Sequence, residues 1–267
     1  MSSPLLEQSE TVAVLPQRPS HGLRAVVQSI GSKSTILALQ AGTGILTARI
    51  LGPAGRGELA AMILWPLFVA SITTLGVPSS LIFHLRNRSE EGEQLVTNGF
   101  VMAALMGTVA AAIAAAVLPW WLHEYSPSVI HAAQWFVLTV PLCSVTLAGR
   151  AVLEAKHDFS ASNAIQILTP LVTLSGLLII IAAHSMNSYT AALAYIAASL
   201  PSFWFMLYCV RRTGLRAARL QLGVMKQILQ YGVRSYGIDL LGTLALQVDQ
   251  VLVVSLLSAD AMGSYVV

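Results

Sequence analysis

The chain has 267 residues, of which 55% are hydrophobic and 10% charged, and its mean hydropathy is +0.71. Ordinary soluble domains carry about a quarter charged residues, so this composition excludes a soluble globular domain. One membrane span with its loop takes about 30 to 40 residues, which predicts about seven spans. No stretch outside the apolar segments is long enough to build a separate soluble core.

The charges and cysteines exclude two further classes of protein. The formal net charge is only +3 and no uniform basic patch is visible, so we expect no nucleic-acid partner. Cys143 and Cys209 both lie in apolar runs, which argues against a disulfide framework and against a metal site. Residues 1–29 are polar and lack the apolar core of a signal peptide, so we expect a polar cytoplasmic segment.

The apolar runs predict an all-α membrane protein. In lipid each span must satisfy its own backbone hydrogen bonds, and these runs show no alternating strand pattern. Four prolines, Pro66, Pro141, Pro170 and Pro201, predict bent helices. We expect transmembrane helices over 30–51, 60–84, 97–118, 132–150, 164–183, 190–209 and 236–257.

The distribution of basic residues predicts the orientation. Thirteen of the 15 Lys and Arg residues fall on the side of the N-terminus, and the other side has Arg49 and Arg56 alone. By the positive-inside rule the N-terminus is cytoplasmic. An interfacial aromatic belt is predicted at the outer ends of the third and fourth spans from Trp120, Trp121, Tyr125 and Trp135.

Two segments have distinctive patterns. The third span carries Gly107 among many alanines at three- and four-residue spacing, which favours close helix packing over a substrate surface. Residues 210–235 form a basic linker with apolar residues at helical spacing on one face. That linker is either an amphipathic helix on the inner membrane surface or a helix that packs on its own neighbours.

No enzyme motif is present. The glycine-rich segment 52–58 has no lysine, so it is not an ATP-binding loop, and neither HExxH nor GxSxG occurs. We therefore expect a protein that is not an enzyme. Any energised transport has to use an ion gradient, the membrane potential or a separate subunit.

Ionisable residues inside the spans are the default functional candidates because charge is costly in hydrocarbon. In the seventh span, Asp249 beside Gln250 has three interpretations: cation or proton coupling, a structural pairing, or direct contact with substrate. Asp239 lies near the inner boundary and is expected to be solvated or to start a helix. Near the outer end, Arg49 is expected to hold the first hairpin, through carbonyls or Glu58, or to attract an anionic head group.

A weak internal repeat links the first and seventh spans. A shift of 206 residues sets residues 45–52 over residues 251–258, and Gly57 then falls on Gly263. The repeat indicates that the seventh span restarts the pattern of the first. We expect a polar segment at 1–29, a six-helix lobe at 30–209, the linker at 210–235 and the first helix of a second lobe at 236–267.

The first hairpin resembles that of a known transporter family. The segment Ala48–Ala60, ARILGPAGRGELA, is followed by Leu-Trp-Pro at 64–66 and Gly-Val-Pro at 76–78. This pattern is similar to the Wzx-like polysaccharide flippases of the multidrug/oligosaccharidyl-lipid/polysaccharide (MOP) exporter superfamily. Val248-Asp249-Gln250, with Gly263 and Tyr265, resembles the opening of that family's second lobe.

This resemblance implies a fold and an activity. It implies two six-helix lobes that form a V, and the translocation of a polyprenyl-diphosphate-linked oligosaccharide to the outer leaflet of a bacterial inner membrane. Sodium or proton coupling is implied, with no other cofactor, and the polysaccharide biosynthesis machinery is the implied partner beside the bilayer. Candidate phosphate contacts are Arg49 and Arg56 at the outer mouth, and Lys33, Arg86 and Arg88 at the inner one.

Other functions stay open at this stage. A drug or metabolite cation antiporter of the same fold is expected to carry carboxylates in the first lobe, and the predicted third to sixth spans contain none. A membrane-embedded glycan polymerase or ligase needs a large outer loop, and the longest here has about a dozen residues. A last alternative is a non-transporting chain that assembles with another one. A full flippase needs about twelve spans, so we expect this chain to be an incomplete portion.

Overall fold

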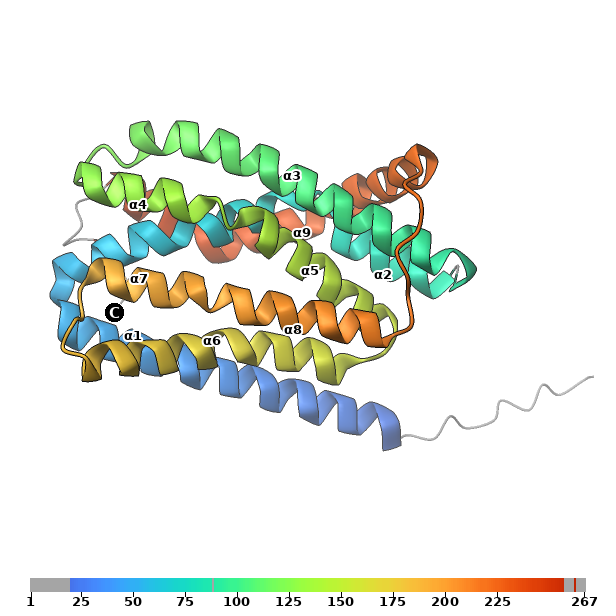
Figure 1. Ribbon diagram of the computed structural model, residues 1–267, viewed down its shortest axis with the longest axis horizontal. Coiled ribbons are helices and arrows are strands. Elements are labelled where there is room, and N and C mark those ends of the chain that lie inside the picture. The colour runs from blue at the N-terminus through green and yellow to red at the C-terminus, as the bar shows by residue number, and fades with distance from the viewer. Residues whose placement is uncertain (1–19, 88, 257–261, 263–267) are drawn as a thin grey trace, which may run out of the picture.

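A computed structural model describes residues 20–87, 89–256 and 262, and over these residues the chain is helical, with no strand (Figure 1). This confirms the predicted all-α membrane fold. The helices are α1 (Ser20–Thr73), α2 (Val77–Asn87), the short 3₁₀ helix η1 (Ser89–Glu91), α3 (Gly92–Trp121), α4 (Pro127–Val137), α5 (Val140–Ala155), α6 (Phe159–Ala182), α7 (Ser188–Ala197), α8 (Ser199–Arg212) and α9 (Leu222–Leu256).

Five helical segments among the described residues are long and apolar enough to cross a membrane. They support a multi-pass membrane protein. Two of them combine neighbouring helices, because α4 with α5 and α7 with α8 each form one span. The segments are 30–73, 92–121, 127–155, 159–182 and 188–212.

The first two predicted spans meet at a single residue. No loop separates them, because Gly52 alone leaves the helical conformation (φ 67°, ψ −178°) and the helix resumes at once with Pro53. A positive φ is accessible to glycine without steric cost, and proline suits the first turn of a helix. In Figure 1 the blue half of α1 runs beside α6, reverses at the left end and returns as the cyan half.

Prolines decide where two of the spans break. The ring of a helical proline clashes with the carbonyl four residues earlier. Helix α4 ends four residues before Pro141, and α7 ends four residues before Pro201, so the predicted bends at these positions are full interruptions. Pro66 and Pro170 instead lie inside α1 and α6.

The third span packs closely, as its small residues predict. A β-carbon on Gly107 of α3 would lie 2.8 Å from the Cα of Pro141, at the start of α5. Ala103, Ala110 and Ala111 are buried on the same helix. The α3–α5 contact therefore depends on the absence of larger side chains here.

The linker fastens to α3 before α9 begins. Three backbone N–H groups of its irregular part donate to side chains of α3: Arg216 to Glu93 (3.2 Å), Ala218 to Thr97 (3.0 Å) and Gln221 to Asn98 (2.9 Å). Helix α9 then runs without interruption into the predicted seventh span. Val224 and Ile228 are buried in a cluster with α2, α3, α5 and α8, which favours the helix that packs on its neighbours.

Candidate functional site

The kink at Gly52 brings Arg56 back onto the first half of α1. Its side chain is 8% exposed, and its Nη1 donates to the hydroxyl of Thr47 at 2.7 Å. Thr47 is fully buried and donates in turn to the carbonyl of Thr43 at 2.8 Å. The Nε of Arg56 is buried and has no partner among the described residues. Arg56 therefore fixes the two halves of α1 to each other and keeps one N–H unused.

The other two charged residues of the hairpin do not pair with each other. Arg49 is exposed, and the structure records no ion pair between it and Glu58 within the residues it describes. Glu58 is half-buried and close enough to Tyr125, in the loop between α3 and α4, to affect that phenol. Burial first, and then the charge of Glu58, raise the pKa of Tyr125 to about 12.

Tyr125 was expected in the aromatic belt, and this part of the prediction is wrong. Its side chain is 6% exposed, whereas Trp120 and Trp135 are 80% and 71% exposed. Tyr125 belongs to the hydrophobic core because the short loop folds it inward among α1 and α4. The three exposed tryptophans, Trp121 included, keep the position that a membrane interface favours.

The predicted inner-mouth residues are spread out. Lys33 is exposed on α1, and Arg86 at the end of α2 donates through Nη2 to the carbonyl of Glu154 at 3.2 Å. Arg88 lies outside the described residues. The structure thus ties Arg86 to the end of α5 and does not bring it to Lys33.

The candidates of the seventh span lie on α9. The backbone of Asp239 and Asp249 is helical, but their side chains are outside the described part of the structure. Gln250 is half-buried. Among the described residues no cluster of His, Cys, Asp or Glu could hold a metal ion.

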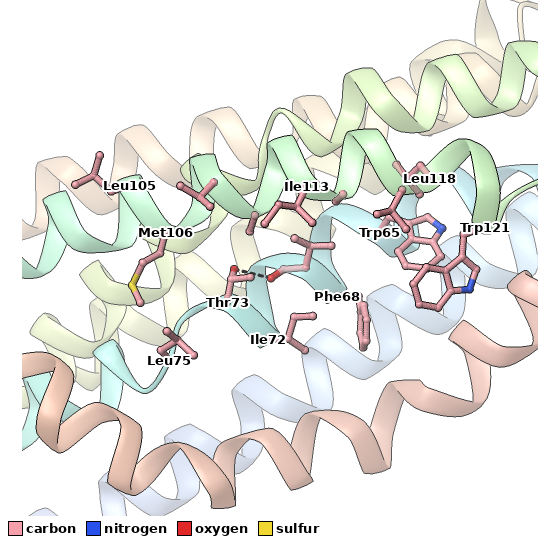
Figure 2. A pocket seen from close by; sticks show the side chains of 15 residues that line it. Trp65, Phe68, Ile72, Thr73, Leu75, Leu105, Met106, Ile113, Leu118 and Trp121 are labelled. Carbon is pink, nitrogen blue, oxygen red and sulfur yellow. Dashed lines mark hydrogen bonds between the residues drawn. The ribbon is translucent and has the colours of Figure 1, made fainter.

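An apolar groove of about 570 Å³ lies between the second half of α1 and α3 (Figure 2). Trp65 and Trp121, whose rings are 5.2 Å apart, stand at one end, and Leu75 and Met106 are at the other. The lining is almost entirely apolar, and the hydroxyl of Thr73 is already engaged, because it donates to the carbonyl of Val69. Such a lining can accept hydrocarbon but offers nothing to a charged group.

One ion pair on α5, between partly exposed side chains, was not predicted from the sequence. Arg150 and Glu154 are one turn apart on α5, with 3.8 Å between Nη2 and Oε1. Glu154 Oε1 also accepts a hydrogen bond from Ser162 of α6 at 2.7 Å. Because α5 extends to Ala155, a carboxylate does lie on the fourth span, contrary to the predicted boundary at 150. The i, i+4 spacing of opposite charges was the available signal.

The described helices have the fold of MOP-superfamily transporters. An inward-facing multidrug resistance MATE family transporter of that superfamily matches with a TM-score of 0.62 and 14% identity, over 87% of this chain and 56% of its own. A MATE protein in the straight conformation matches with a TM-score of 0.67 and 13% identity, over 91% of this chain and 58% of its own. A MOP transporter from Pyrococcus furiosus matches with a TM-score of 0.62 and 13% identity, over 91% of this chain and 63% of its own. It is described as having a binding pocket of reverse polarity.

The family itself is identified by sequence. Residues 46–267 match the family described as polysaccharide biosynthesis protein, so the chain belongs to that family, in agreement with the resemblance of its first hairpin. No curated protein sequence matches the chain significantly. Family and fold together describe a polysaccharide biosynthesis protein that has the fold of MOP-superfamily transporters. The chain spans 56% to 58% of the length of the MATE structures described above.

Proposed function

We propose that this protein, in its complete form, flips a polyprenyl-diphosphate-linked oligosaccharide from the inner to the outer leaflet of a bacterial inner membrane. One observation carries the proposal: the polysaccharide biosynthesis family covers 46–267 on a transporter fold. The first hairpin resembles that of flippases for lipid-linked glycans, which gives the substrate its chemical class. The N-terminus is cytoplasmic in this proposal, because the basic residues lie on that side.

The apolar groove suits the lipid part of such a substrate. An isoprenoid chain is pure hydrocarbon, and the groove between α1 and α3 offers a lining of aliphatic and aromatic side chains. Its volume of about 570 Å³ accommodates several isoprene units and leaves the remainder of the chain in the bilayer. We assign the groove to the isoprenoid chain for this reason.

The charged parts of the substrate need a polar path. A diphosphate cannot cross hydrocarbon unaided, so the flippase has to offer cationic or hydrated contacts in sequence. We propose Lys33, Arg86 and Arg88 as contacts at the inner mouth and the exposed Arg49 at the outer one, where the buried Arg56 supports the hairpin through Thr47. Coupling to a sodium or proton gradient is assigned to Asp249. Glu58, Asp239 and Gln250 are assigned structural roles, with no part in coupling.

The decisive experiment follows lipid-linked intermediates in cells. Deletion of the gene is expected to abolish the surface polysaccharide and to leave its lipid-linked precursor in the inner leaflet, and re-expression of the complete gene is expected to restore export. Unchanged polysaccharide and unchanged intermediates would contradict the proposal.

A multidrug antiporter is the alternative that the fold raises, because two of the matched structures are MATE transporters. The same deletion strain separates the two functions. Increased sensitivity to cationic drugs with normal polysaccharide would favour the antiporter. A polysaccharide defect with unaltered drug sensitivity would favour the flippase.

A further inference from the structure

A second cleft, of about 190 Å³, lies inside the bundle and differs in character from the apolar groove. Four helices enclose it: α1, α5, α6 and α8. At roughly 30 Å³ for each molecule, this volume holds about six waters, or one small polar group with part of its hydration. Its lining combines apolar residues, such as Leu147 and Ile165, with polar ones, among them Thr146, Arg150, Gln166, Thr169 and Ser202.

Arg150 is the one charged side chain among the described residues of that lining. Its Nε is buried and has no hydrogen-bond partner within the described structure. The pairing with Glu154 engages Nη2 only and at 3.8 Å, while Ser162 shares the carboxylate. A buried guanidinium N–H without an acceptor costs free energy, and Glu154 engages only one end of the group, so Arg150 keeps unused hydrogen-bonding capacity at the cleft.

Hydroxyl and amide groups line the same cleft as this guanidinium. Thr169 and Ser202 lie 2.7 Å apart across α6 and α8, and Ser202 also donates to the carbonyl of Ala198 at 3.1 Å. Thr146, one turn before Arg150 on α5, donates to its own helix at the carbonyl of Leu142 (2.8 Å). Hydroxyl protons rotate, so these groups can turn their protons toward an anion.

The cleft lies next to the interruptions in two spans. Ser199 begins α8 directly after the break at Ala198, and Cys143 lies in the first turn of α5 after the break between α4 and α5. These breaks fall near the middle of the spans 127–155 and 188–212. Polar groups at such depth, beside broken helices, are typical of substrate sites in transporters. Arg150 lies two turns further along α5 than Cys143, so the cleft extends from the breaks toward the end of α5.

We propose that this cleft binds a phosphate-type anion, with the guanidinium of Arg150 as the charged contact and Gln166, Thr169 and Ser202 as neutral donors. A cation site is disfavoured because the guanidinium contributes the only charge from the described lining. The proposal rests on the proposed function only for the source of the anion, a diphosphate that carries an isoprenoid chain. Arg150 then holds the head group near the end of α5, on the side of the proposed inner mouth.

The test is a binding measurement on the purified protein in a zwitterionic detergent, with calorimetry as the readout. Inorganic diphosphate and farnesyl diphosphate are titrated separately, because the first represents the free anion and the second a lipid head group. We expect Arg150→Gln to weaken binding of farnesyl diphosphate about tenfold or more, and Arg150→Lys to weaken it less, since lysine keeps the charge but loses the planar contact. Equal dependence on Arg150 for both probes would indicate recognition of the free anion.

Two further variants keep the test decisive if Arg150→Gln fails to fold. Thr146→Leu fills the cleft and leaves the ion pair in place, so it is expected to weaken binding to a similar degree. Arg211→Gln removes an exposed basic residue at the end of α8 and is expected to bind normally. Absence of binding to both probes, or binding that Arg150→Gln and Thr146→Leu leave unchanged, would overturn the proposal. Loss of polysaccharide export with intact binding would instead count against other parts of the flippase.

Discussion

Gly76 and Gly232 lie against each other, backbone to backbone, where the turn between α1 and α2 crosses α9. A β-carbon on Gly76 would overlap the carbonyl oxygen of Gly232, and one on Gly232 would lie 2.6 Å from the carbonyl oxygen of Leu75. Beside this crossing the hydroxyl of Tyr236 donates to the carbonyl of Ile72, in the last turn of α1. Helix α9 is therefore attached to the turn after α1, just before the predicted seventh span, at a point where two glycine backbones leave no room for a β-carbon.

The first prediction concerns this crossing. Gly232→Ala is expected to destabilise the protein by about 1 to 3 kcal/mol, because the backbone of α9 has to move away from the turn. Gly237→Ala is the matched control on the same helix, since a β-carbon at that position would have no neighbouring atom within 4 Å. Alanine there is expected to raise stability slightly through helix propensity. Thermal unfolding in detergent measures both, and equal midpoints for the two variants would refute the close contact.

The second prediction tests the connection across the kink. Thr47→Val removes the acceptor of Arg56 and keeps the shape of the side chain, so a buried guanidinium loses its recorded partner. We expect a loss of about 1 to 3 kcal/mol. Thr35→Val, on the exposed face of the same helix, is the control because its hydroxyl bonds only its own backbone. Unfolding midpoints that do not differ between these two variants would contradict the role of Thr47.

Alkaline pH provides the third prediction. The pKa of Tyr125 is about 12 in the fold and 10.0 ordinarily, so the unfolded chain releases this proton first. Stability is therefore unaffected by Tyr125 below pH 10 and falls as the pH rises from 10 toward 12. Tyr125→Phe is expected to reduce that loss, whereas Tyr208→Phe, an exposed position, is expected to leave it unchanged. An identical pH dependence in both variants would rule out the buried phenol as the cause.

The fourth prediction tests the orientation. Single cysteines at Ser126 and Ser185, both exposed, are expected to react with a membrane-impermeant maleimide in intact cells. A cysteine at Lys156, exposed in the loop between α5 and α6, is expected to react only after the cells are opened. The native Cys143 and Cys209 are replaced first so that they do not contribute. The reverse labelling pattern would invert the topology.

The fifth prediction addresses energy coupling. Asp249→Asn in the complete protein is expected to abolish gradient-driven translocation at normal expression, because the amide cannot exchange a proton or balance a cation. Asp239→Asn is the control, since that residue is expected near the membrane boundary. Both are measured by export of the lipid-linked glycan. Undiminished export in Asp249→Asn would remove it from the coupling mechanism.

Local sequence rules account for much of the fold. Apolar runs located the spans, and the carbonyl that proline displaces explains why the chain breaks four residues before Pro141 and Pro201. The same rules do not distinguish Pro141 and Pro201 from Pro66 and Pro170, which lie inside α1 and α6 without interrupting them. Whether a membrane helix tolerates proline depends on how neighbouring groups satisfy the freed carbonyl, which is a tertiary property.

The candidate site was less accessible to sequence reasoning. Arg56 is expected at the outer mouth from the sequence, but it is buried because the chain reverses at Gly52 alone. The Gly-Pro pair indicates a break there, but not that the second half of α1 folds back without a loop. Arg150 was counted only among the basic residues of the inner side. Arg150 lines the cleft together with serine and threonine residues from three other helices. This arrangement is not predictable from the sequence, because residues of separate spans share no regular spacing.

The continuity of α9 has a mechanical consequence. A helix of 35 residues is a stiff rod of about 52 Å, and its contact with Gly76 falls about 15 Å from one end and 36 Å from the other. Tyr231, stacked on Phe83, and Tyr236, bonded to Ile72, flank the crossing and hold α9 there. The crossing therefore divides α9 into two arms of unequal length. By geometry alone, a tilt of about 10° about this point would shift the linker end by about 3 Å and the far end by about 6 Å.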